Sequence, residues 1–351
     1  MRLSPVLSLA LALASALVAC RDQASGGGGG ARGEIRAVGS STVYPFTTTI
    51  AEAFVAADPD AAAPVIESTG TGAGMRLFCA GIGAAHPDIV NASRRMKTSE
   101  YRECQRHGAT ALLEIPVGID GLAFAQAKDG PAFRLTPALL YRALAATPKG
   151  APNAARLWSD LDPALPAVPI QVYGPPATSG TRDALAELIL TKGCEAYDPA
   201  AKRLAQTDPD AAKALCTSVR EDGAYVDAGE NDNLIVQKLQ SNPNAIGVFG
   251  YSYLEENGEN ARGLAIDGVE PSYEAIADGR YPGARTLYLY VKKAHLDAVP
   301  GLRTFLKLYA AQWGPGGPLA KRGLIVAPDA VRAQAGAVVA RETALDPRTL
   351  S

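Results

Sequence analysis

Three short segments rich in glycine, serine and threonine each precede a predicted helix. They read GSSTVYP at 39–45, STGTGAG at 68–74 and TSGTRD at 178–183. The first N–H groups of a helix have no partner within it and lie at the positive end of its dipole, so they favour an anion. Serine and threonine hydroxyls add short hydrogen bonds to the anion's oxygens. Together the three loops predict an oxyanion site built from distant parts of the chain.

Each loop taken singly has an ordinary explanation, because serine and threonine are also common N-caps of helices. Catalysis is a second alternative. Ser179 is a conceivable nucleophile, but no GxSxG pattern surrounds it and no histidine is near it in the sequence. The glycines at 70–74 are followed by Met75 and Arg76 rather than by the lysine of a P-loop. We therefore expect anion binding without catalysis, metal or cofactor, and keep a secreted phosphatase or other hydrolase as an alternative.

The elements that position these loops alternate short β-branched runs with longer Ala- and Leu-rich stretches, which is typical of an α/β fold with a mostly parallel sheet. Strands are predicted at 34–39, 64–68, 88–91, 111–118, 122–126, 169–173, 245–249 and 286–291. Helices are predicted at 45–57, 74–81, 99–107, 137–145, 181–191, 233–241 and 302–312. The Asp-, Pro- and Ala-rich stretch at 194–227 reads as a helix within a disulfide-clamped excursion.

The N-terminus has the pattern of an export signal, with Arg2 followed by an apolar run to Ala19 that is too short for a convincing membrane span. The sequence LVAC at 17–20 resembles the lipobox of bacterial lipoproteins, which predicts lipid attachment at Cys20 after removal of residues 1–19. Residues 20–33 include five consecutive glycines and predict a flexible tether. We expect an exported, lipid-anchored protein on the periplasmic or cell-surface side of a membrane.

Four further cysteines remain, an even number in a chain sent to an oxidising compartment. Four cysteines allow three pairings, of which we favour the sequential one, Cys79 with Cys104 and Cys194 with Cys216. Each bridge would close a loop of about two dozen residues and contribute roughly 3 kcal/mol in the loop-entropy model. Zinc is the alternative, but the chain has no CxxC pair and its three histidines are scattered.

Length and charge limit the class of protein. The mature chain exceeds what one core usually serves, so two domains are expected. The formal net charge of −2 becomes −3 once Arg2 leaves, so no global positive field attracts nucleic acid. An anion site must therefore be local.

Taken in order, several segments resemble the phosphate-binding subunit of bacterial phosphate ABC importers, a periplasmic-binding-protein family of type II topology. They are GSSTVYPF at 39–46, STGTGAG at 68–74, DIVNASRRMK at 88–97, TSGTRD at 178–183, NDNLIVQKL at 231–239, NAIGVFGYSYLEEN at 244–257 and YPGARTLYLYV at 281–291. The resemblance implies two α/β lobes joined by crossovers near 118–121 and 284–287, with the ligand cleft between them. It places lobe 1 at 34–118 and 285–351, and lobe 2 at 119–284.

The resemblance also implies which residues bind the anion. The hydroxyl and amide ligands correspond to Ser41, Thr42, Thr71, Gly72, Ser179, Gly180 and Thr181. Arg94 is the expected counter-charge and Arg95 its rival.

Two positions depart from the family pattern. Arg94 follows Ser93 where well-known members have an aspartate that accepts the proton of hydrogen phosphate, and Pro175 stands where members often have an arginine. The proton acceptor is therefore unassigned, with Asp120 and Asp232 as guesses, and without it phosphate and sulfate are harder to distinguish.

The resulting expectation is a monomeric binding protein that is not an enzyme. It would close on inorganic phosphate and deliver it to an ABC permease driven by a cytoplasmic ATPase. Another oxyanion, such as sulfate or molybdate, is the alternative within the same fold.

Overall fold

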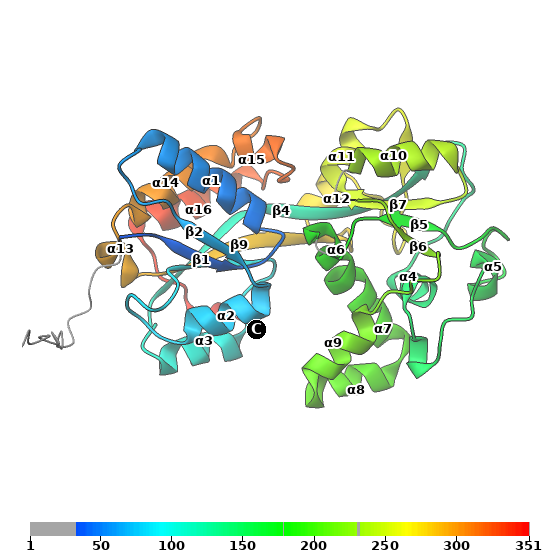
Figure 1. The fold of residues 1–351 in the computed structure, drawn as a ribbon, viewed down its shortest axis with the longest axis horizontal. Helices are drawn as coiled ribbons and strands as arrows, with labels where there is room; N and C mark the ends of the chain where they lie inside the picture. The colour runs from blue at the N-terminus through cyan, green and yellow to red at the C-terminus, as the bar shows by residue number, and fades with distance from the viewer. Residues whose placement is uncertain (1–32, 178, 230–231, 351) are drawn as a thin grey trace, which may run out of the picture.

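The computed structural model describes residues 33–350 except 178, 230 and 231, and gives no side-chain description for Asp232. The predicted signal peptide, the lipidation site Cys20 and nearly all of the tether lie outside these residues. The described chain forms two α/β lobes side by side (Figure 1). One mixed sheet runs through both in the order β2-β1-β3-β9-β4-β7-β5-β6, and β8 also pairs with β4.

The strands are β1 (Arg36–Gly39), β2 (Val65–Ser68), β3 (Ile89–Ala92), β4 (Leu112–Ala127), β5 (Val172–Gly174), β6 (Tyr225–Asp227), β7 (Ile246–Gly250), β8 (Ala261–Gly263) and β9 (Ala284–Lys292). The helices of lobe 1 are α1 (Tyr44–Ala57), α2 (Thr71–Cys79), α3 (Thr98–Arg106), α13 (His295–Ala298), α14 (Leu302–Gln312), α15 (Pro318–Lys321) and α16 (Asp329–Arg341). Those of lobe 2 are α4 (Pro137–Leu144), α5 (Trp158–Leu161), α6 (Gly180–Ala184), α7 (Thr191–Tyr197), α8 (Pro199–Thr207), α9 (Pro209–Thr217), α10 (Asp232–Ser241), α11 (Tyr251–Glu256) and α12 (Tyr273–Ala277). A π-helical segment, Leu185–Leu190, joins α6 to α7.

The lobes have separate cores. In lobe 1, α1, α14 and α16 pack on one face of the sheet around Phe54 and Phe305, and α2 and α3 pack on the other around Phe78. Lobe 2 has a larger core that includes Phe124 and Trp158. Among the described residues, no helix is long and apolar enough to cross a membrane.

The lobes are joined by β4 and β9, which pair antiparallel from Leu112 with Lys292 to Gly121 with Ala284. β4 then continues into lobe 2, where it pairs with β7 and β8. The sequence predicted two strands here, at 111–118 and 122–126, but the structure has one with a register shift between Pro116 and Gly118. Proline has no N–H for the ladder, so an irregularity is expected beside it, and the strand continues beyond.

The prediction of a mostly parallel sheet was wrong at the centre of the molecule. Within each lobe, β1 and β5 pair parallel with their neighbours, but β4 and β9 run antiparallel to theirs. Two long strands that pass between lobes in opposite directions must pair antiparallel with each other. The predicted crossovers at 118–121 and 284–287 fall within this pair.

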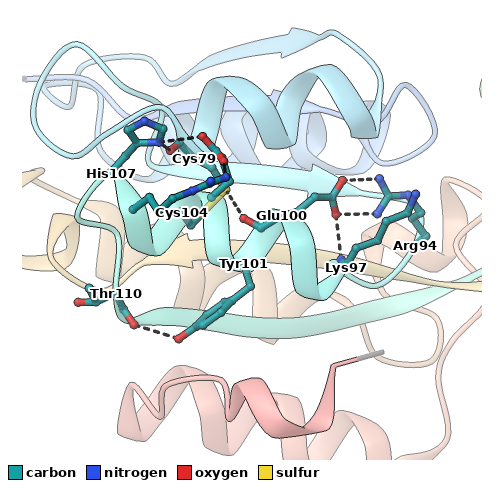
Figure 2. The surroundings of a disulfide bond; sticks show 10 residues. Cys79, Arg94, Lys97, Glu100, Tyr101, Cys104, His107 and Thr110 are labelled. Carbon is teal, nitrogen blue, oxygen red and sulfur yellow. Dashed lines mark hydrogen bonds and ion pairs between the residues drawn. A yellow bond between two sulfur atoms is a disulfide. The ribbon is translucent and has the colours of Figure 1, made fainter. Parts of the chain in front are cut away.

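Both predicted disulfides are present. Cys79–Cys104 joins α2 to α3, with the Cα atoms 4.0 Å apart (Figure 2), and Cys194–Cys216 joins α7 to α9, with the Cα atoms 5.4 Å apart. In the part of the chain that the structure describes, no cluster of side chains could hold a metal ion. The cysteines therefore stabilise packing within each lobe.

Candidate functional site

The three predicted loops meet at a cleft of about 800 Å³ lined by both lobes. Its lobe 1 wall comes from the loop after β1, the start of α2 and the turn between β3 and α3. Its lobe 2 wall comes from the helical stretch α6 to α9, which faces α2 and α3 across the molecule (Figure 1). Four predicted ligands line it: Ser41, Thr71, Gly72 and Arg94.

The first and third loops touch each other at the inner end of the cleft. The Ser41 hydroxyl donates to the carboxylate of Asp183, and the Thr42 hydroxyl donates to the carbonyl oxygen of Gly180 at 3.2 Å. Gly180 has no side chain, and a Cβ there would lie 2.8 Å from the Cα of Thr42. Glycine at this position is therefore what allows the two backbones to approach so closely.

The second loop is fixed by a hydroxyl pair. Gly70 precedes α2 with φ of +77°, a backbone conformation that favours glycine. Thr71 begins α2, and its hydroxyl lies 2.9 Å from that of Ser93 and accepts from the Ser93 N–H at 3.1 Å. Both side chains are buried, and both line the lobe 1 wall of the cleft.

The third loop caps α6. The Ser179 hydroxyl accepts from the N–H of Thr181 at 3.2 Å, as an N-cap does. Ser179, Gly180 and Thr181 do not line the cleft in this structure. Asp183 and Glu187, one turn further along, line it instead. Neither was among the residues predicted from the sequence.

Arg285 is the cation at the centre of the site, and it was also missed. It is the second residue of β9, and its side chain is only 6% exposed. Its Nε donates to Asp120 at 3.0 Å, its Nη2 donates to the Thr42 hydroxyl at 2.9 Å, and its Nη1 donates to Glu187. One guanidinium thus connects the strand pair, lobe 1 and lobe 2.

Two carboxylates share this guanidinium. Burial raises the pKa of Asp120, against the lowering effect of the Arg285 charge. Glu187 is more accessible, with a side chain 39% exposed, and the Ser93 hydroxyl lies 3.4 Å from its Oε2. Asp120 and Asp232 were the predicted candidates for a proton acceptor. Asp120 already accepts a hydrogen bond from Arg285, and the side chain of Asp232 is not among those that the structure describes.

Arg94 lies on the cleft wall with its charge already matched. Its Nη1 and Nη2 donate to the two carboxylate oxygens of Glu100 at 2.9 and 2.6 Å (Figure 2), and this pairing raises the pKa of Arg94. The rival Arg95 pairs with Glu114. Both arginines are therefore paired with carboxylates in this structure, Arg94 with Glu100 and the more buried Arg285 with Asp120 and Glu187.

Hydroxyl donors, one buried guanidinium and the carboxylates of Asp183 and Glu187 at the inner end of the cleft make a candidate binding site. No histidine is among the residues lining the described cleft, and Ser179 is bound to a main-chain N–H. This arrangement lacks the activated nucleophile that hydrolases need. What the site can do is hold a small anion by hydrogen bonds and charge between two lobes.

The fold and this site define a two-lobed binding protein. A model of the PBP superfamily domain matches residues 24–312, and the chain belongs to that superfamily. It is 30% identical over 289 residues to Protein SphX of Synechococcus elongatus, covering 81% of this chain and 75% of that protein. It is 28% identical over 295 residues to the phosphate-binding protein PstS of Staphylococcus saprophyticus, covering 81% and 79%.

Solved structures agree on the fold. A possible phosphate binding protein from Planctomyces limnophilus aligns with a TM-score of 0.70 and 27% identity, covering 88% of this chain and 98% of that one. PstS from Borrelia burgdorferi aligns with a TM-score of 0.57 and 16% identity, covering 85% and 100%, which supports the fold alone. The predicted family and fold class are thereby confirmed.

Proposed function

We propose that this protein captures inorganic phosphate in the cleft between its lobes and delivers it to an ABC permease. The observation that carries the proposal is Arg285, a buried cation that meets hydroxyl donors from lobe 1 and the helix of the third loop at one point. Relatives named for phosphate binding have the same fold. The superfamily consists of binding proteins, so no turnover is expected.

The carboxylates of Asp183 and Glu187, at the inner end of the cleft, would determine which anion is accepted. Asp183 and Glu187 accept hydrogen bonds from Ser41 and Arg285, so they occupy donors that an anion would use. A fully ionised anion would be repelled by them. Hydrogen phosphate brings an O–H donor that a carboxylate can accept, whereas sulfate at neutral pH does not. We therefore infer that Asp183 or Glu187 fills the acceptor role that the sequence left unassigned.

Location and anchoring follow from the N-terminal pattern. We propose that the chain is exported, lipidated on Cys20 and held near the permease by the glycine-rich tether, as a monomer. Cys20→Ala is expected to move the protein from the membrane fraction to the soluble fraction without changing phosphate affinity. Membrane retention of that variant would refute the anchor.

Calorimetry tests the ligand. The chain from residue 21 onward, stripped of bound anion by unfolding and refolding, is titrated with phosphate, sulfate and molybdate, and is assayed for turnover of a generic phosphoester. We expect phosphate binding at least tenfold tighter than sulfate, with no turnover. Tight sulfate binding without a phosphate response would refute the proposal, and measurable turnover would restore the hydrolase alternative.

A further inference from the structure

The turn between β3 and α3, residues 93–97, carries one of the hydroxyls of the lobe 1 wall. Ser93 is buried, its N–H donates to the Thr71 hydroxyl at 3.1 Å, and its own hydroxyl lies 3.4 Å from Oε2 of Glu187 in lobe 2. Residues 93–97 form neither helix nor strand. Because such a turn has no repeating hydrogen bonds of its own, the position of Ser93 depends on the contacts that the rest of the turn makes.

Tyr290 on β9 holds the turn at one point. Its side chain is fully buried, and its hydroxyl accepts from the Met96 N–H at 2.7 Å. The same hydroxyl donates to Oε2 of Glu114 on β4, also at 2.7 Å. Burial raises the pKa of Tyr290, so the hydroxyl keeps the proton that it donates. The turn is thereby tied to both strands that connect the lobes.

Arg95 holds the turn at a second point. Its Nε donates to Oε2 of Glu114 at 2.9 Å, and its Nη2 donates to Oε1 at 2.8 Å. Its Nη1 donates to the carbonyl oxygen of Thr349 at 2.6 Å, and its Nη2 also donates to the Thr349 hydroxyl at 2.8 Å. All three nitrogens of the guanidinium are used, and the single nitrogen of a lysine could not replace them. Arg95 therefore joins the turn to β4 and to the end of the chain.

Thr349 belongs to the C-terminal tail, defined here as residues 345–350. The tail is attached to lobe 1 independently of Arg95, since the Leu345 N–H donates to a carbonyl oxygen of β4 at 2.7 Å. Leu345 and Leu350 also pack against the core cluster that contains Met96. The tail is thus part of the packing of lobe 1, and it presents two acceptors to the arginine of the turn.

We propose that Arg95 is a positioning residue of the anion site, and that the C-terminal tail is a functional part of the cleft wall. Arg95 would act through the turn without touching the anion, because its guanidinium is directed to Glu114 and Thr349. By holding the turn, these contacts would keep the Ser93 hydroxyl in the place where it meets the ligand. The inference rests on the proposed function, since it takes phosphate as that ligand.

Phosphate titration by calorimetry tests the role, at a temperature at which every variant is folded. Arg95→Ala removes the support, and Arg95→Lys keeps the charge without the fork of three nitrogens. We expect both to weaken phosphate binding about tenfold, because a turn that must be ordered on binding costs affinity. A chain that ends at Leu345 should weaken it about threefold, since Glu114 still holds Arg95.

Arg303→Ala is the matched control for Arg95→Ala. The side chain of Arg303 is 39% exposed, against 38% for Arg95. It likewise donates to a glutamate, Glu342, and to a main-chain carbonyl oxygen, that of Leu296. It lies on α14 of the same lobe and does not line the described cleft. We expect phosphate affinity within about twofold of wild type, because the lost contacts are partly exposed and distant from the turn.

Amide hydrogen exchange of the turn is the second measurement, because a general loss of stability would not affect the turn selectively. The N–H groups of Ser93 and Met96 donate to Thr71 and Tyr290, so they exchange slowly while the turn is held. Peptides that cover residues 91–97 should exchange faster than in wild type in both Arg95 variants and in the shortened chain. They should exchange at the wild-type rate in Arg303→Ala.

The outcomes separate the two proposals. Unchanged affinity in Arg95→Ala, full rescue by Arg95→Lys, or an equal loss in Arg303→Ala would each overturn the positioning role while leaving phosphate as the ligand. Sulfate binding by wild type without a phosphate response would refute the proposed function, and the sulfate affinities of the same variants would then decide the positioning role. A wild type that binds neither anion would overturn both.

Discussion

The two walls of the cleft differ in what they offer a ligand. Lobe 1 presents hydroxyls, those of Ser41, Thr71 and Ser93, at the ends of strands and the start of α2. Lobe 2 presents the carboxylates of Asp183 and Glu187, one helical turn apart. The two walls are joined by the hydrogen bond that the Ser41 hydroxyl donates to the Asp183 carboxylate.

This difference explains how the two walls can contact each other through hydrogen bonds that an anion could replace. The hydroxyls of Ser41 and Thr42 donate to Asp183 and Gly180 of lobe 2, so these polar groups are hydrogen-bonded where the lobes meet. A ligand must replace those bonds with better ones, which favours an anion that also donates. Arg285 belongs to neither wall, since it projects from β9 and reaches both.

Removing Arg285, which contacts both walls, is expected to have the largest effect on phosphate affinity and on stability. Arg285→Ala should weaken phosphate binding by at least about 2 kcal/mol, or roughly 30-fold, because a buried charge partner is lost. The protein should also lose about 3 kcal/mol of stability, because Asp120 is left buried without its counter-charge. Calorimetry and denaturant unfolding measure the two effects.

Arg94→Ala is the matched control, since Arg94 is the cation that the sequence favoured. Its pair with Glu100 is partly exposed, so we expect less than about 1 kcal/mol in either measurement. A larger binding loss for Arg94→Ala than for Arg285→Ala would return the counter-charge to Arg94.

Gly180→Ala tests the contact between the walls. The added Cβ would lie 2.8 Å from the Cα of Thr42, so the lobes must separate and phosphate affinity should fall about tenfold. Stability should change by less than about 1 kcal/mol, because the greater helix propensity of alanine is offset by the lost contact with Thr42. Gly336→Ala on α16, where nothing lies within 4 Å of the new Cβ, should show only the gain in stability. Unchanged affinity of the Gly180 variant would mean that the bound state does not need this contact.

The substitution Thr181→Val tests whether the Thr181 hydroxyl of the third loop donates a hydrogen bond to bound phosphate. Valine keeps the shape but removes a donor, so phosphate binding should weaken by about 1 kcal/mol. Thr181 does not line the cleft in this structure, so a loss of affinity would indicate that the third loop moves toward the anion on binding. Thr207→Val, at the exposed end of α8, is the control. Equal affinities for both variants would place Thr181 outside the bound site.

Acid should weaken lobe 2 through a pair remote from the cleft. The hydrogen bond from buried Arg220 lowers the pKa of Asp222 to about 2. The folded-state pKa is below the unfolded value of about 3.9, so this stabilisation is present above pH 4 and is lost as the pH falls toward 2. Asp222 is more than a third exposed, so we expect less than about 1 kcal/mol. Thermal unfolding of wild type and Asp222→Asn between pH 5 and 2 should converge at the acid end, and a constant difference would contradict the assignment.

Much of the fold was predictable because strand and helix patterns are local. The loops at 39–45 and 68–74 were found because glycine, serine and threonine before a helix have a direct physical use. Arg285 was missed because a single arginine in an apolar strand has no local pattern, and its role depends on Asp120 in the neighbouring strand. That pairing exists only once β4 and β9 are aligned.

Other features that were not predicted, namely the cleft carboxylates of lobe 2 and two of its helices, have recognisable patterns in the sequence. Asp183 and Glu187 are four residues apart in the helix that follows the third loop, so they could have been placed on one face. The pairs Asp198-Pro199 and Asp208-Pro209 are N-cap and first-turn signatures, and they predict the two helices that the excursion at 194–227 contains.

The place of Arg285 on the strand pair has a mechanical consequence. When two bodies rotate about a hinge, displacement grows with distance from the axis, so a group rooted at the pivot hardly moves. Rotation of the lobes about β4 and β9 would therefore leave the guanidinium in position, while the hydroxyls of one wall and the carboxylates of the other would move apart. An anion that enters the cleft would first contact the charge of Arg285 and would form hydrogen bonds to the two walls afterward. On the permease, opening the lobes would remove those bonds in the reverse order and leave the anion held by a single contact.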